Sequence, residues 1–127
     1  MTQSVIIAVN DPHILYLLQR YAEESGFQPV NAAQGKDILN LLDRQPGPAL
    51  LILDAEFSEN ASQKTPLRLR AAAADHHVPI VLYSCLEDPP DEWSEGVAAR
   101  LPRAVMYDDF VGALRCAGLR VQHAHRA

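Results

Sequence analysis

A continuous apolar run at residues 49–54, ALLILD, constrains the fold of this chain more than any other feature of the sequence. Gly47 and Pro48 precede the run, and a polar stretch follows it. A run of this length without polar alternation is typical of a strand that is covered on both faces. Such strands belong to parallel sheets, in which ligands bind beyond the carboxyl ends of the strands. Asp54, the last residue of the run, is therefore a candidate for function.

Strands and helices are predicted to alternate along the whole chain. Alternation of apolar runs and turn residues predicts strands at residues 4–9, 27–32, 49–54, 78–83 and 99–102, and Pro29 favours an edge position for the second. Helical spacing of apolar residues predicts helices from Pro12, capped by Asp11, to Gly26, and at residues 35–44, 66–77, 91–98 and 107–116. This order favours an α/β fold: a doubly wound, five-stranded parallel sheet with strand order 2-1-3-4-5 and helices on both faces.

Length, charge and composition limit what the chain can do. At 127 residues it is long enough for one domain, which we expect at residues 1–118, with residues 119–127 as a frayed tail. A net charge of -5 argues against direct binding to nucleic acid, which needs a cationic surface. No apolar stretch approaches the about 18 residues of a membrane span and no signal peptide is visible, so a cytoplasmic protein is expected. Two cysteines, Cys85 and Cys116, make no disulfide framework and are expected to be buried.

Polar residues end or follow four strands that the predicted order makes neighbours. The first strand lies beside the third, which brings Asn10 and Asp11 next to Asp54. Two carboxylates this close both stay ionised only if a cation lies between them, and oxygen ligands in a wet site suit Mg²⁺. In that setting Asp54 could attack a phosphorus centre. Ser84, after the fourth strand, could donate a hydrogen bond to a phosphoryl oxygen, and Arg103, after the fifth, could supply a positive charge.

These residues and their spacing make the chain resemble the receiver domains of two-component response regulators. The matching segments are VIIAVNDP, LLILDAE, VPIVLYS and GVAARLPRAVMYDDFVGAL, which follow the family's order and spacing over residues 4–118. In that family an acidic pair follows the first strand and a phospho-accepting aspartate ends the third. A serine or threonine ends the fourth strand, and a lysine follows the fifth. The resemblance implies a flavodoxin-like fold and a single-domain, divergent receiver that signals through phosphorylation.

The resemblance also implies a ligand set and partners. Asp54 matches the phospho-acceptor, which takes its phosphoryl group from a histidine kinase, a phosphotransfer protein or a small phosphodonor. Asp11 and Asp54 match the carboxylates that bind Mg²⁺, Asn10 would hold a metal-bound water, and the backbone carbonyl of Glu56 matches the third protein ligand. Such a domain accepts a phosphoryl group and is not a stand-alone enzyme. Its expected output partner binds the face of the fourth and fifth elements, through which a homodimer could also form.

Several positions depart from the family pattern. Ser84 matches the family's switching hydroxyl, but Asn10 replaces an acid, which predicts weaker binding of Mg²⁺. Arg103 replaces the lysine, and a planar guanidinium is not a compact ammonium. Ala104 replaces the proline that follows it. Arg100 stands where the family commonly has the tyrosine or phenylalanine that rotates inward on phosphorylation, and an arginine cannot fill that apolar slot cheaply.

Two other classes of function stay open at this point. One is a degenerate pseudo-receiver, acting as a phosphorylation-independent interaction module. It is favoured by Asn10, Arg100 and Arg103 and opposed by the retained Asp54, Asp11 and Ser84. An enzyme on the same fold is the other class. The sequence DAE that begins at Asp54 lacks the second aspartate of aspartyl phosphatases. Residues 10–13, NDPH, include the acidic Asp11 and do not suit the phosphate of a flavin.

Overall fold

The sheet of this chain has the predicted order and direction. The computed structural model describes residues 3–32, 35–44, 47–54, 65–83, 97–101 and 105–121. Its strands are β1 (Ser4–Ala8), β2 (Gln28–Asn31), β3 (Leu50–Asp54), β4 (Ile80–Tyr83) and β5 (Ala99–Leu101). They form one parallel sheet in the order β2-β1-β3-β4-β5, so the predicted fold class is confirmed.

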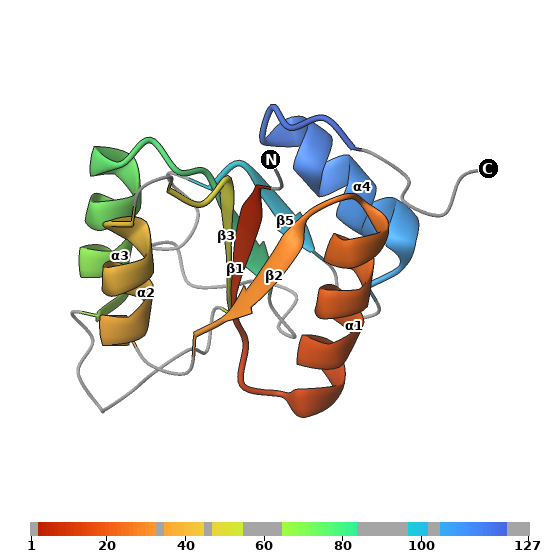
Figure 1. Cartoon of the computed structure of the whole chain (residues 1–127), viewed down its shortest axis with the longest axis horizontal. Helices are drawn as coiled ribbons and strands as arrows, with labels where there is room; N and C mark the ends of the chain where they lie inside the picture. Colours follow the sequence, from red (N-terminus) through yellow and green to blue (C-terminus); the bar gives the residue numbers. More distant parts are fainter. Residues whose placement is uncertain are drawn as a thin grey trace.

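Helices cover both faces of this sheet. The described helices are α1 (Pro12–Glu24), α2 (Gly35–Leu42), α3 (Thr65–Asp75) and α4 (Tyr107–Cys116). Helices α1 and α4 lie on one side of the sheet, and α2 and α3 lie on the other (Figure 1). The helix predicted at residues 91–98 lies outside the described residues. None of the described helices is long and apolar enough to cross a membrane.

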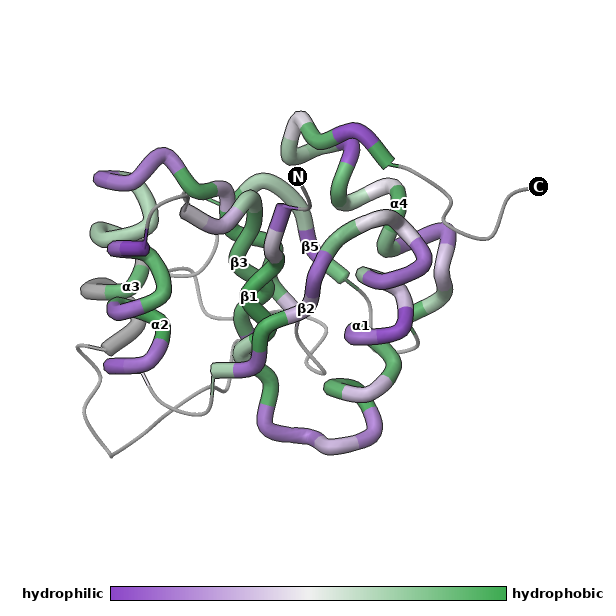
Figure 2. Tube along the Cα trace, viewed as in Figure 1, coloured by the Kyte–Doolittle hydropathy of each residue, from purple (hydrophilic) through white to green (hydrophobic). Residues whose placement is uncertain are grey.

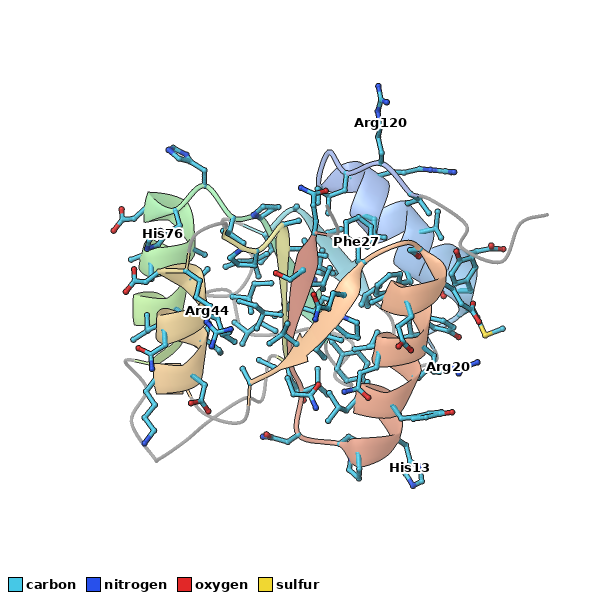
Figure 3. The ribbon with its side chains drawn as sticks, in the orientation of Figure 1. His13, Arg20, Phe27, Arg44, His76 and Arg120 are labelled. Carbon is cyan, nitrogen blue, oxygen red and sulfur yellow. The ribbon has the colours of Figure 1, made fainter. Side chains whose placement is uncertain are left out.

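The core has two layers because alternate residues of the buried strands point to opposite faces. One layer, the α1/α4 cluster, consists of Val5, Ile7, Val9, Leu18, Ala22, Phe27, Leu50, Ile52, Val81, Tyr83, Leu101, Val105, Phe110, Ala113 and Leu114. The other, the α2/α3 cluster, consists of Ile6, Ala8, Ala32, Ile38, Leu41, Leu42, Leu51, Leu53, Leu69, Ala73, Val78, Ile80 and Leu82. Figure 2 shows the apolar strands between helices with polar outer surfaces. The charged side chains of Arg20 and Arg120 extend away from the sheet (Figure 3).

Helix α1 begins and ends at residues that the sequence marks. The Asp11 carboxylate accepts hydrogen bonds from the backbone N–H of His13 at 2.8 Å and of Ile14 at 3.4 Å, and Pro12 takes the first helical position. Gly26 has a φ of 88°, a left-handed conformation that glycine adopts without strain and that ends the helix. These signals place the start of α1 immediately after the carboxyl end of β1.

The side chain of Cys116 differs from what was expected of it. Cys116 is exposed at the end of α4, so the expectation that it is buried is wrong. Its place on the outer face of the helix, opposite Phe110 and Leu114, explains the exposure.

Leu119 and Val121 pack against the α1/α4 cluster, although both follow the predicted domain boundary at residue 118. The tail beyond Val121 lies outside the described residues, and the boundary stays a prediction.

Candidate functional site

The carboxyl edge of the sheet places the ends of four strands side by side. Asp54 of β3 is in register with Tyr83 of β4, and Tyr83 is in register with Leu101 of β5. On the other side of β3, Ala8 of β1 is in register with Leu53. Because the strands are parallel, all of them end at this same edge, which is the edge where Asp54 lies.

Asn10 and Asp11 follow β1 at this edge. Ala8 is level with Leu53, so Val9 comes beside Asp54, and the two polar residues come immediately after. Both are exposed. Asp11 is held by its capping bonds, which both use the oxygen Oδ1. A carboxylate has a second oxygen, so a helix cap and a metal ligand are compatible roles for the same side chain.

Asp54 is nearly buried, with 7% of its surface exposed, at the end of a strand whose other residues are all buried. Ser25 is the only other buried polar or charged residue in the part of the chain that is described. An ionised carboxylate is rarely buried to this extent unless it is hydrogen-bonded, paired with a cation or bound to a metal. The position of Asp54 is therefore unusual for a residue that only ends a strand.

The other predicted site residues lie outside the described residues. Ser84 is the next residue after Tyr83, and Glu56 comes two residues after Asp54. Arg103 comes two residues after Leu101. The strands that precede all three end in the row that contains Asp54. Their placement and their roles stay predictions.

The donor atoms at this edge suit a hard cation. Within the described ranges, no group of three or more His, Cys, Asp or Glu residues could hold a metal ion. The predicted set needs only two acidic side chains, Asp11 and Asp54, together with the Asn10 amide and one backbone carbonyl. Carboxylate, amide and carbonyl oxygens with several waters are the ligands of Mg²⁺. The residues present therefore fit Mg²⁺ and not a softer metal.

Arg100 is exposed on β5. Its neighbours Ala99 and Leu101 pack into the α1/α4 cluster, so alternation along the strand turns Arg100 away from that cluster. The exposure of Arg100 agrees with the sequence-based expectation that an arginine does not fill the apolar slot of the family's aromatic residue.

Sequence reasoning missed a network between α1 and the segment after β5. The Tyr21 hydroxyl donates a hydrogen bond to the backbone carbonyl of Val105 at 3.0 Å. The ring of Tyr21 lies edge-on to Tyr107, with ring centres 5.5 Å apart, and 5.8 Å from Phe110. The sequence marks Tyr21 only as one apolar position of a helix. No local signal connects it with Val105, because the two residues are 84 positions apart.

Comparison with known proteins identifies the fold. No family profile matches the chain, and no curated protein is significantly similar to it in sequence. A response regulator receiver protein from Burkholderia phymatum is 17% identical with a TM-score of 0.74, covering 94% of this chain and 98% of its own. The bacteriophytochrome response regulator AtBRR is 19% identical with a TM-score of 0.74, covering 93% and 94%.

A signal receiver domain of a putative Luxo repressor protein from Vibrio parahaemolyticus is 12% identical with a TM-score of 0.73, covering 92% of this chain and 90% of its own. These neighbours are receiver domains, and each matches nearly the whole of both chains. The chain therefore has the receiver-domain fold, and the low identities agree with a divergent sequence.

Proposed function

We propose that this receiver-fold chain is a response regulator receiver, phosphorylated on Asp54 with Mg²⁺, that signals through protein–protein contacts. One observation carries the proposal. A nearly buried aspartate ends β3 beside the strand that leads to Asn10 and Asp11, at the point where the strand order of the sheet reverses. The solved structures compared above are response regulators and receiver domains, which supports a signalling role.

The phosphoryl transfer uses residues of this edge. The Asp54 carboxylate attacks the phosphorus of a phosphohistidine or a small acyl phosphate. A new O–P bond forms an aspartyl phosphate while the bond from phosphorus to the leaving group breaks, and the leaving group takes the electron pair. Ser84 donates a hydrogen bond to a phosphoryl oxygen, and Arg103 supplies the fixed positive charge.

Asp11, Asp54, the Glu56 carbonyl and a water on Asn10 would hold Mg²⁺. When bound, Mg²⁺ neutralises charge on the phosphoryl oxygens. Asn10 removes one negative charge from the usual set, so the proposed site binds this cation weakly.

The proposal includes partners and location. The phosphoryl group comes from a histidine kinase or a phosphotransfer protein in the cytoplasm, and the chain is not a stand-alone enzyme. The output protein binds the face formed by α4, β5 and the helix predicted at residues 91–98, and a homodimer could use the same face. The formal charge of -5 gives no support to direct contact with nucleic acid.

A second candidate function is a pseudo-receiver that binds its partner without phosphate. Arg100 favours this function. In the family an aromatic residue at this position rotates inward on phosphorylation, whereas Arg100 is exposed. Asn10 favours it as well, because a weaker metal site slows phosphorylation.

Intact-mass spectrometry after incubation with acetyl phosphate separates the two functions. We expect one added phosphoryl group on the wild type in the presence of Mg²⁺, and none without metal. Asp54→Ala should take up none, whereas Asp43→Ala, which changes an aspartate that is 73% exposed at the end of α2, should behave like the wild type. A wild type that remains unlabelled under conditions that label an ordinary receiver would favour the pseudo-receiver.

A further inference from the structure

Strand β2 forms one edge of the sheet. It comes first in the order β2-β1-β3-β4-β5, so within the described residues its only neighbouring strand is β1. In Figure 1, β2 lies in front of β1, with α1 on one side and α2 on the other. The outer edge of such a strand presents backbone N–H and C=O groups that can pair with a strand of another molecule. The residues of β2 therefore decide whether a second copy of this chain can extend the sheet.

The hydrogen bonds of β2 show which of its residues face outward. The N–H groups of Gln28 and Ala32 donate to the carbonyl groups of residues 3 and 7, on the side of β1, at 2.9 and 3.1 Å. Along a parallel strand, alternate residues direct their backbone groups to opposite neighbours. The two residues out of step with Gln28 and Ala32 are Pro29 and Asn31, and their backbone groups therefore face the open edge.

Of these two residues, only Asn31 can donate a backbone hydrogen bond outward. Proline has no N–H, so Pro29 offers a carbonyl acceptor and no donor. The ring carbon bonded to the proline nitrogen takes the place of the missing hydrogen and projects toward the open edge. A strand that approached this edge would lose a ladder bond at Pro29 and would also meet the ring.

The missing donor acts twice when the approaching strand belongs to a second copy. Two copies related by a two-fold axis would place their β2 strands antiparallel. An axis through Val30 would set Pro29 of each copy opposite Asn31 of the other. In such a hydrogen-bonded pair, each residue normally donates one bond and accepts one. Pro29 therefore removes one bond from each pair, and this interface keeps only the bonds that Asn31 donates.

We propose that Pro29 closes the open edge of the sheet to a second copy of this chain, and that contacts between molecules are thereby directed to other surfaces. The inference concerns the backbone donors of β2 and does not depend on phosphorylation of Asp54. A residue with an N–H at position 29 should allow β2 to pair with β2 of another copy.

The test measures self-association of the whole chain by sedimentation velocity over a range of concentrations. Pro29→Val is compared with Gln28→Val, because both place a β-branched apolar residue in the same strand. Only Pro29→Val adds an outward donor, since the Gln28 N–H already bonds on the side of β1. We expect Pro29→Val to raise the association constant for dimer formation about tenfold or more, and Gln28→Val to stay within about twofold of the wild type.

A second variant moves the proline along the strand. Pro29→Val combined with Asn31→Pro adds one outward donor and removes the other, so its self-association should return to the wild-type level. Equal self-association of wild type and Pro29→Val would overturn the inference. An equal increase in Pro29→Val and Gln28→Val would also overturn it, because apolar surface would then be the cause. If the valine variants precipitate, Pro29→Thr and Gln28→Thr repeat the comparison with a more polar side chain.

Discussion

Asp11 has a structural role that is visible and a chemical role that is proposed. It caps α1 through Oδ1, so its contribution to folding does not depend on a metal. The same side chain lies at the carboxyl edge of the sheet, one strand away from Asp54. Because an N-cap needs a hydrogen-bond acceptor and a metal site also needs charge, two substitutions can separate the roles.

Asp11→Ala and Asp11→Asn should differ in stability and agree in metal binding. The alanine variant loses the cap and should lower the free energy of unfolding by about 1 kcal/mol. The asparagine variant keeps a good capping acceptor and should lose only about a few tenths of a kcal/mol. Both should weaken Mg²⁺ binding severalfold, because both remove a negative charge. Urea unfolding and isothermal titration calorimetry measure the two effects. An asparagine variant with full Mg²⁺ affinity would contradict the assignment of Asp11 as a ligand.

Tyr21 also predicts a dependence of stability on alkaline pH. Its pKa is raised in the folded state, by burial first and then by Glu24 and Asp109. A raised pKa means that the folded chain holds this proton more tightly than the unfolded chain, whose tyrosine ionises near 10.0. The stabilisation is complete below pH 10 and is lost as pH rises through the higher pKa of the folded state.

Wild type should therefore lose more stability between neutral pH and pH 11 than Tyr21→Phe does. Chemical denaturation at several pH values gives the difference directly, and Tyr16→Phe is the control, since Tyr16 is 62% exposed. Parallel stability curves for wild type and Tyr21→Phe would show that the proton on Tyr21 has no influence.

At the scale of elements, local signals predicted more than they missed. The start of α1 at Pro12, the edge position of β2 with Pro29 and the bounds of α4 are all confirmed. Each depends on signals that lie within the element: a cap, a proline, or apolar residues at helical spacing. The sequence marks the end of α3 less clearly. After this helix the left-handed conformation, which glycine usually adopts, is taken by His77 with a φ of 57°.

The predicted site was only partly accessible to sequence reasoning. Asp54 and Asp11 could be named because strand order follows from the order of elements, and strand order brings the strand ends together. The bond from Tyr21 to Val105 could not, because it depends on how α1 and α4 pack against each other. The exposure of Cys116 likewise depends on the face that α4 turns to the sheet.

Two glycines of the α4 region should respond oppositely to alanine. Gly112 is exposed within the helix and has open space where a Cβ would be, so Gly112→Ala should raise the free energy of unfolding by about 0.5–1 kcal/mol. Gly118 ends the helix with a φ of 83°, so Gly118→Ala should lower it by about 1 kcal/mol. Thermal and urea unfolding report both changes. A stabilising Gly118→Ala would contradict the left-handed turn that ends α4.

The whole molecule is a sheet between two apolar layers, and both layers depend on the same strands. Neighbouring residues of β3 alternate between them, with Ile52 in the α1/α4 cluster and Leu51 and Leu53 in the α2/α3 cluster. Neither layer can form without the sheet, so we expect the layers to unfold together although they lie on opposite faces of it.

Matched truncations in the two layers test this expectation. Ile52→Val and Ile38→Val remove the same methyl group from buried positions on opposite faces of the sheet. Each should lower the free energy of unfolding by about 1 kcal/mol. The double variant should lose the sum within about 0.5 kcal/mol, in one transition. Two separate transitions in urea, or a change in slope for one variant alone, would show that the layers are not one cooperative unit.

Phosphorylation of Asp54 is tested by locating the phosphoryl group on the chain. After incubation with acetyl phosphate and Mg²⁺, borohydride converts an aspartyl phosphate to homoserine, and peptide mass mapping finds the converted residue. We expect homoserine at position 54 only, and none when Mg²⁺ is withheld. Conversion at another aspartate, or at none while an ordinary receiver is converted in parallel, would contradict the assignment of Asp54 as the phospho-acceptor.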